Sequence, residues 1–297
     1  MDVVDIMIAP KTPKAFICSL MPFPLFSKLL DRTCRKCRVI RKYLQFRYVN
    51  IISKLLWNFG EKMLRVFNLT VSYGSTRAVD DASLSVADNS ITCVFGLNGA
   101  GKSSLLRAIV GLAPLRSGEV FLDSRRVTGS RPEDLARLGM TLVPEGRDIF
   151  KTLTVQENLM VPIGPGGDDD PVAEVLELFP ILRERLRSPA GLLSGGEQQQ
   201  LAIARALVMR PKMILVDEPS LGLAPLMIEK VYSHFLELKR RGLTILVVEQ
   251  NVSRVLSVTD KAYLMSNGHL QSAGGIKDLV ERKKIERAYF GESPERR

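Results

Sequence analysis

The sequence predicts an α/β domain built on a mainly parallel sheet, and three observations support this prediction. Apolar runs with the character of buried strands stand at residues 91–95, 213–216 and 244–248. Helical patterns follow, at residues 102–112 and 226–240. Strands that alternate with helices form parallel sheets with right-handed crossovers. The third observation is a glycine-rich segment that joins the first of these strands to the first helix.

The remaining parts of the pattern add two lobes to this core. Residues 64–74 alternate in polarity and end in a turn, as a first strand would. Residues 118–127 are typical of short antiparallel strands, which predicts a small antiparallel β lobe. Residues 164–171, rich in Gly, Asp and Pro, predict a loop. Helical character on both sides of this loop predicts a helical lobe at about residues 150–210.

Composition places the chain among ordinary globular proteins, with 45% hydrophobic and 25% charged residues in 297. No apolar run approaches the roughly 18 residues of a membrane-spanning helix. The net charge of +10 comes mainly from residues 1–62, which hold 12 basic and 4 acidic residues. Residues 63–297 hold 30 basic and 28 acidic residues and are nearly neutral. Nucleic acid is therefore not an expected partner of the main domain.

A domain boundary is expected near Met63, where a basic, irregular segment gives way to the strand pattern. One explanation of residues 1–62 is that Met63 is the real start and that this extension is not native or is disordered. The other is a basic amphipathic helix over residues 36–59 on an anionic membrane surface. Cys34 and Cys37 have the spacing of half a zinc site, but the sequence holds no second Cys or His pair to complete it.

The glycine-rich segment has the pattern G-x-x-x-x-G-K-S of a phosphate-binding P-loop. Its glycines allow backbone N–H groups to surround phosphates at the positive end of a helix. The lysine would neutralise the β- and γ-phosphates, and the serine hydroxyl would bind Mg²⁺. A plain glycine turn before a helix is the alternative. The expected ATP-binding residues here are Gly96, Leu97, Asn98, Gly99, Ala100, Gly101, Lys102, Ser103 and Ser104.

Two carboxylates follow the apolar strand of residues 213–216. Ligands of parallel sheets bind at the carboxyl ends of the strands, so both should lie beside the P-loop. Asp217 is expected to hold Mg²⁺ through water, and Glu218 to accept a proton from the attacking water. Alone, such a pair can be solvated loop charges; the P-loop in the same chain favours the catalytic interpretation.

A second glycine pair, Gly195 and Gly196, precedes a helical run at residues 200–209. Backbone N–H groups exposed at a helix start can form a second anion site. Ser194, with Glu197 three residues on, can equally cap the helix. The two interpretations are compatible.

The P-loop, Leu-Ser-Gly-Gly-Glu-Gln and Val-Asp-Glu-Pro stand in the order, and roughly at the spacing, of the ATP-binding cassette of ABC transporters, which residues 63–297 resemble. In that family two cassettes pack head to tail and sandwich two ATP molecules. The resemblance implies that the second glycine motif contacts, in trans, the γ-phosphate held by the other cassette, through Ser194, Gly195, Gly196 and Glu197. It also implies that Tyr73 stacks on adenine, although a strand-end tyrosine needs no such role.

Three positions depart from the general cassette pattern. Glu145 replaces the glutamine of the loop that contacts Mg²⁺ and the membrane partner. Gln250 replaces the switch histidine; its amide can donate to phosphate but cannot titrate as histidine does. Residues 220–225 replace the usual Leu-Asp loop end. Together they resemble the F-type (LivF) ATPases of branched-chain amino-acid importers. The similar urea and short-amide importer ATPases have glutamine where Glu145 stands.

The resemblance implies an ATP-hydrolysing subunit that energises uptake of branched-chain or related amino acids through a separate permease. A urea or short-amide importer ATPase, or a soluble cassette acting on ribosomes or DNA, is the alternative. The expected catalytic residues are Glu218, Lys102 and Gln250. The expected metal-binding residues, with Mg²⁺ and ATP as cofactors, are Ser103, Asp217 and Glu145, of which the last also contacts ATP.

The same resemblance implies partners and a location. A homodimer, or a heterodimer with a second ABC ATPase, is expected to bind integral membrane permease subunits. A periplasmic or surface substrate-binding protein would act indirectly, and no nucleic acid is expected. The location would be cytoplasmic, peripheral on the inner face of the cell membrane.

Overall fold

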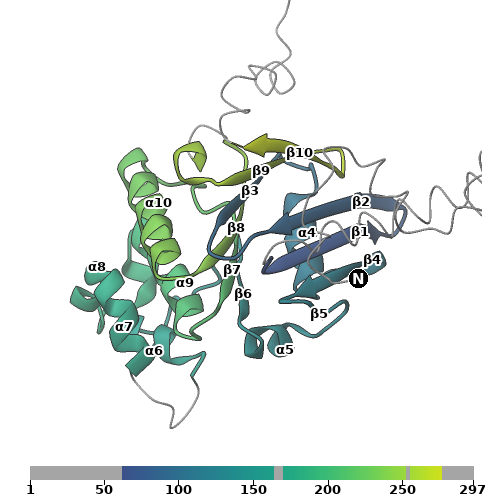
Figure 1. Ribbon diagram of the computed structural model, residues 1–297. Coiled ribbons are helices and arrows are strands. Elements are labelled where there is room, and N and C mark those ends of the chain that lie inside the picture. Colours follow the sequence, from purple (N-terminus) through teal and green to yellow (C-terminus); the bar gives the residue numbers. More distant parts are fainter. Residues whose placement is uncertain (1–61, 164–169, 252–254, 276–297) are drawn as a thin grey trace, which may run out of the picture. The chain divides into compact units, whose positions relative to one another are not determined.

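The computed structural model describes residues 62–163, 170–251 and 255–275, all within the compact unit Glu61–Arg297 (Figure 1). The expectations for the basic extension, its amphipathic helix and Cys34 and Cys37 fall outside the described residues. Across the ranges that are described, no helix has both the length and the apolar character of a membrane span.

A six-stranded sheet in the order β10-β9-β3-β8-β7-β6 forms the centre of this unit. Its strands are parallel except for β10, which pairs antiparallel with β9. This confirms the expected mainly parallel sheet. The strand bounds are β3 Ile91–Phe95, β6 Met140–Val143, β7 Met213–Asp217, β8 Thr244–Glu249, β9 Lys261–Ser266 and β10 His269–Gly275.

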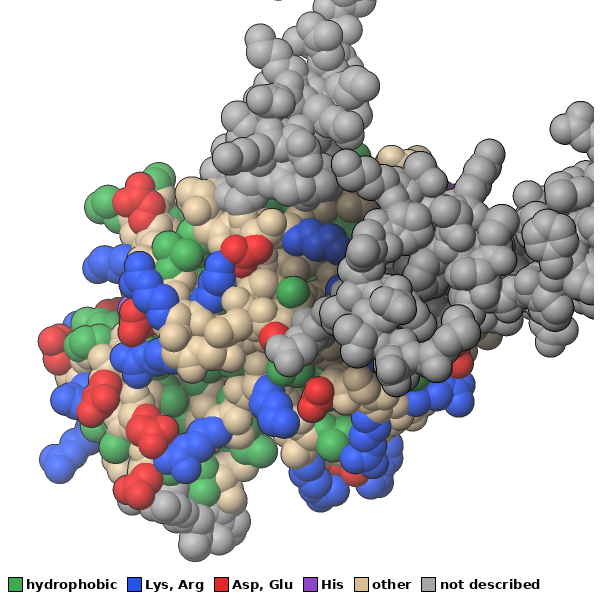
Figure 2. Space-filling view, viewed as in Figure 1, with side chains coloured by type: hydrophobic (Ala, Val, Ile, Leu, Met, Phe, Trp, Pro, Cys, Tyr) green, Lys and Arg blue, Asp and Glu red, His purple; other side chains and the backbone are tan. Residues whose placement is uncertain are grey.

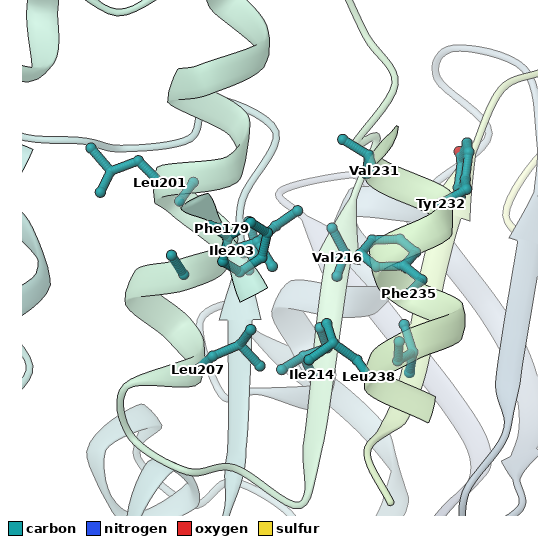
Figure 3. Close-up of a cluster of buried hydrophobic side chains, with 14 of the residues drawn as sticks. Phe179, Leu201, Ile203, Leu207, Ile214, Val216, Val231, Tyr232, Phe235 and Leu238 are labelled. Atoms are coloured by element: carbon teal, nitrogen blue, oxygen red, sulfur yellow. The ribbon is translucent and has the colours of Figure 1, made fainter. Parts of the chain in front are cut away.

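Strands β3, β7 and β8 are buried along their whole length and are mostly apolar, because both faces of the sheet are covered. In β3, Cys93 and Phe95 belong to one hydrophobic core and Val94 to the other. Such strands appear in a sequence as continuous apolar runs rather than alternating ones. Figure 3 shows Phe235 of α10 (Pro225–Arg240) packed against Val216 of β7. Full burial of an aromatic ring of this kind stabilises the fold by about 2–3 kcal/mol.

Helix α4 (Lys102–Ile109) packs in the hydrophobic core that contains Val94, beside the four-stranded sheet β2-β1-β4-β5. All pairings in this sheet are antiparallel, which confirms the expected β lobe. The helix ends before residue 112, where the sequence pattern placed its end. Gly111 adopts φ +76°, and a Cβ there would clash with the carbonyl oxygen of Ser130. The strand bounds are β1 Leu64–Tyr73, β2 Thr76–Val86, β4 Leu115–Leu122 and β5 Arg125–Arg126; the short helix α5 (Pro132–Arg137) leads into β6.

The helical lobe stands on the other side of the central sheet and consists of α6 (Val155–Met160), α7 (Asp170–Leu178), α8 (Pro180–Glu184), the 3₁₀ turn Ala190–Leu192 and α9 (Gly195–Leu207). Two boundaries differ from expectation. The predicted loop should reach residue 171, but α7 begins at Asp170, because a Pro is well tolerated in a first helical turn. Helix α9 begins at Gly195 instead of residue 200, because Ser194 caps it.

The buried amide of Asn158 fixes the chain that enters this lobe. Its Oδ1 accepts from the Phe150 N–H at 2.9 Å, and its Nδ2 donates to the carbonyls of Phe150 and Thr154, both at 2.9 Å. On the surface, acidic and basic side chains are interspersed over the described part of the face in Figure 2. That pattern agrees with the nearly neutral charge of residues 63–297.

Candidate nucleotide-binding and hydrolysis site

The P-loop connects β3 to α4 and needs glycine at defined points. Gly99 and Gly101 both adopt left-handed backbone conformations, with φ +80° and +106°. A Cβ at Gly101 would clash with the carbonyl oxygen of Ala78, so no other residue fits there. Gly101 is also the N-cap of α4 and supplies no side-chain acceptor to the first-turn N–H groups. These donors can therefore face a phosphate.

Lys102 is held inside this loop by three oxygens. Its Nζ donates to the carbonyls of Gly96 at 2.7 Å and Leu97 at 3.1 Å. The same Nζ lies 2.9 Å from Oε1 of Glu218, and only 3% of the Lys102 side chain is exposed. A buried ammonium that is fully paired in this way is already in position to neutralise a phosphate bound by the loop.

Asp217, at the end of β7, lies beside the first turn of α4. Ser103 Oγ donates to its Oδ1 at 3.0 Å. Burial raises the pKa of Asp217 to about 6, the Ser103 hydrogen bond opposes this rise, and the carboxylates of Glu145 and Glu218 add to it. A hydroxyl and a carboxylate in an environment this negative suit a divalent cation with oxygen ligands.

These donors fit Mg²⁺ better than they fit a metal ion whose ligands all come from the protein. No group of three or more His, Cys, Asp or Glu side chains within the described ranges could hold an ion. Mg²⁺ is usually bound by one or two protein ligands, several waters and substrate phosphates. Ser103 and Asp217 match that requirement, and Glu145 is near enough to act on the Asp217 carboxyl.

The raised pKa of Asp217 predicts a pH-dependent stability. The folded protein holds this proton more tightly than the unfolded chain, whose Asp has a pKa of 3.8. The stability that the protonated Asp217 carboxyl contributes is therefore complete below pH 3.8 and is lost as the pH rises through about 6. We expect urea denaturation without nucleotide or Mg²⁺ to show that the original protein loses about 1–3 kcal/mol more stability over this window than Asp217→Asn does. Parallel pH profiles for the two proteins would contradict it.

Glu218 has a strained backbone that aims its side chain at the P-loop. Its φ of +46° is unusual for a residue with a Cβ and costs about 1 kcal/mol. The Glu218 N–H donates to the carbonyl of Val248 at 3.0 Å, and its carbonyl accepts from the Leu221 N–H at 3.1 Å. The neighbouring strand β8 and the following turn thus hold the conformation that brings the carboxylate to Lys102.

A buried network that sequence reasoning missed lies next to Gln250. Glu249 Oε1 accepts from the Tyr232 hydroxyl at 2.6 Å and from the Ser220 N–H at 3.1 Å. Its Oε2 accepts from the Gln250 N–H at 3.2 Å. Burial raises the pKa of both Glu249 and Tyr232. The network fixes the loop after Glu218 to the end of β8; the only sequence signal was an acidic residue ending an apolar strand.

The second glycine motif lies in a different part of the fold. Ser194 caps α9 as expected: its Oγ accepts from the Glu197 N–H at 3.4 Å, and its own N–H donates to Glu197 Oε2 at 2.7 Å. Helices α9 and α4 pack in different cores, on opposite faces of the central sheet. Gln250 and the strand-end Tyr73 are both exposed, Tyr73 to 44%. The chain therefore assembles the P-loop, Asp217 and Glu218, while the Ser194 motif starts a helix on the other face of the sheet from α4.

A P-loop between a buried strand and a helix, with an acidic pair at the end of a parallel strand, defines a P-loop nucleoside-triphosphate hydrolase. Residues 79–221 match the family model described as ABC transporter. The high-affinity branched-chain amino acid transport ATP-binding protein BraG of Pseudomonas aeruginosa is 40% identical over 236 residues, 77% of this chain and 100% of BraG. The chain belongs to the ATP-binding, ATP-hydrolysing subunits of ABC transporters.

Other comparisons agree with this family. The probable branched-chain amino acid transport ATP-binding protein LivF of Archaeoglobus fulgidus is 39% identical, over 77% of this chain and 99% of LivF. The lipopolysaccharide export ATP-binding protein LptB of Escherichia coli is 34% identical, over 76% of this chain and 95% of LptB. A crystal structure of an ABC transporter ATP-binding cassette in its ADP conformation is 32% identical, with a TM-score of 0.71, over 78% of this chain and 99% of that cassette. The expected fold and family are confirmed.

Proposed function

We propose that this chain energises the uptake of branched-chain or related amino acids through a separate permease. The support is the higher identity to BraG and LivF, at 40% and 39%, than to the export protein LptB, at 34%. Glu145 and Gln250, the substitutions typical of the F-type importers, point the same way. The urea or short-amide importer is the second candidate, and a ribosome- or DNA-binding cassette is disfavoured by the near-neutral main domain.

The proposed mechanism uses the residues that the fold brings together. The P-loop backbone and Lys102 bind the phosphates, and Tyr73 stacks on adenine. Mg²⁺, held by Ser103 and Asp217 with Glu145 nearby, would offset the phosphate charge. When a phosphate takes the Lys102 ammonium, the Glu218 carboxylate loses its partner and can accept a proton from water. The observation that supports this exchange is the 2.9 Å contact between Lys102 and Glu218 beside the P-loop.

The second half of the proposed site comes from another cassette. Residues Ser194–Gly196 would contact the γ-phosphate held by a partner cassette, because the fold keeps them away from their own P-loop. Gln250, in contrast, would donate to the γ-phosphate held by its own P-loop. The proposal therefore includes a dimer, permease subunits that anchor it at the cytoplasmic face of the membrane, and an indirectly acting substrate-binding protein. Residues 63–297 would carry the whole cassette.

Uptake in cells tests the substrate. Cells that lack this chain should lose high-affinity, ATP-dependent uptake of labelled leucine, and the chain supplied from a plasmid should restore it. The Lys102→Ala variant is the matched control and should not restore uptake. Loss of labelled urea uptake with leucine uptake intact would favour the second candidate. Unchanged uptake of both, with the chain recovered on ribosomes or DNA, would reject the transport proposal.

A further inference from the structure

Arg147 has an unusual conformation two residues after Glu145. Its φ is +64°, and that of the next residue, Asp148, is +45°. The turn is closed by the Arg147 N–H, which donates to the carbonyl of Pro144 at 3.0 Å. Two successive left-handed residues that are not glycine each cost about 1 kcal/mol or more. Tertiary contacts must therefore hold this turn.

The Arg147 guanidinium makes these contacts with two other elements. Its Nε donates to Gln199 Oε1 at 3.1 Å, and its Nη1 to Gln198 Oε1 at 3.4 Å. Its Nη2 donates to the carbonyl of Leu221 at 3.4 Å. The side chain thus joins the loop after β6 to the start of α9 and to the loop that follows Glu218. A planar guanidinium donates from three separate nitrogens at fixed angles, whereas an ammonium donates from a single nitrogen.

Helix electrostatics do not explain why a cation stands here. The N-terminus of α9 carries a partial positive charge, which disfavours a guanidinium. Yet a Cβ at Gly195 would lie only 3.6 Å from Arg147 Nη1. The arginine is therefore immediately beside the glycine motif, at an electrostatic cost that its geometry must offset. The three segments that it joins are those that carry Glu145, Ser194–Gly196 and the residues after Glu218.

We propose that Arg147 is a positioning residue that makes the Glu145 loop and the Ser194–Gly196 motif move as one unit. This inference rests on the proposed function, in which Glu145 serves the chain's own nucleotide and the glycine motif serves that of the partner. Arg147 then links the two half-sites within one chain. None of its contacts above is with the P-loop, so its loss should spare the first binding step and impair closure of the dimer.

The test compares Arg147→Ala with Arg147→Lys in the full chain. The control is Arg137→Ala, at an exposed arginine that pairs with Asp134 across a helix surface. We expect R147A to keep the dissociation constant for a fluorescent ATP analogue within about twofold. It should lower kcat by about tenfold or more, because the loss of even one of its three charged hydrogen bonds has an effect of this size. The kcat of R147K should lie between that of R147A and that of the unchanged protein. R137A should match the unchanged protein in both measurements.

Dimer formation separates a positioning role from a merely structural one. In a Glu218→Gln background, light scattering with ATP should show a dimer, and adding R147A should raise the ATP concentration required by about tenfold or more. Equal dimerisation with and without R147A would overturn the inference. If Glu218→Gln alone forms no dimer with ATP, the proposed function itself fails, which is a different result.

Gln199→Leu removes the oxygen that accepts from Arg147 Nε. It therefore provides a second test of the same contact if R147A does not fold. Within the described part of the chain, Gln199 Nε2 is buried with no hydrogen-bond partner, so leucine should be accommodated there. Q199L should reproduce the loss in kcat, and the double variant with R147A should lose little more, as expected of residues that act together. A Q199L protein with normal kcat, or additive losses in the double variant, would contradict the role of Arg147.

Discussion

Glu218→Gln should still bind ATP but hydrolyse it at least about 100-fold more slowly, since a positioned general base contributes on this scale. Glutamine keeps the size of the side chain and an oxygen that can still accept from Lys102, while its amide cannot take a proton from water. Lys102 also keeps its two bonds to the P-loop carbonyls. The variant should therefore remain folded and accumulate in an ATP-bound dimer.

Steady-state ATPase rates and light scattering with Mg-ATP measure both parts of this result. The matched control is Glu174→Gln, the same chemical change at an exposed glutamate that pairs with Arg210. It should leave the rate within about twofold of the original, as surface pairs contribute little. Undiminished hydrolysis in Glu218→Gln would remove Glu218 from the role of base. A slow variant that stays monomeric with ATP would contradict the dimer that the proposed function includes.

The fold could be predicted wherever a short stretch of sequence determines its own structure. The buried strands β3, β7 and β8 are continuous apolar runs, and the P-loop glycines mark the passage from strand to helix. Strand β6, with four residues of which two are partly exposed, has no comparable signal. Its place at the sheet edge depends on pairing with β7, more than 70 residues away. Helix ends are predicted less accurately, because a cap such as Ser194 can start a helix several residues before the apolar pattern begins.

The same distinction applies to the site. Asp217 and Glu218 are adjacent, so the sequence could suggest both at once, and the P-loop is a single segment. The sequence also predicted that this pair lies beside the P-loop, but it could not indicate which side chains of separate elements bond to one another. The Lys102–Glu218 ion pair, the bond from Tyr232 to Glu249 and the contact of Arg147 with Gln199 each join separate elements. Such contacts depend on tertiary packing and leave no spacing pattern.

Lys102→Ala should have two separable effects, on nucleotide affinity and on stability. The variant removes the positive charge placed to meet the phosphates, so ATP affinity should fall by about tenfold or more. It also leaves Glu218, which is 8% exposed, as a buried carboxylate without its cation. Breaking a buried ion pair from one side typically costs about 3 kcal/mol or more, most of which is the cost of the unpaired charge.

The double variant Lys102→Ala/Glu218→Gln isolates the stability effect, because it removes both charges. If the ion pair has the role that the geometry indicates, urea denaturation without nucleotide should find the double variant more stable than Lys102→Ala alone, by about 1–2 kcal/mol. Its ATP affinity should stay as low as that of the single variant, since glutamine cannot replace the ammonium. A double variant as unstable as Lys102→Ala would show that Glu218 is not the charge left unpaired. Normal ATP affinity in Lys102→Ala would contradict the phosphate-binding role, and with it the exchange of partners that we propose for Lys102.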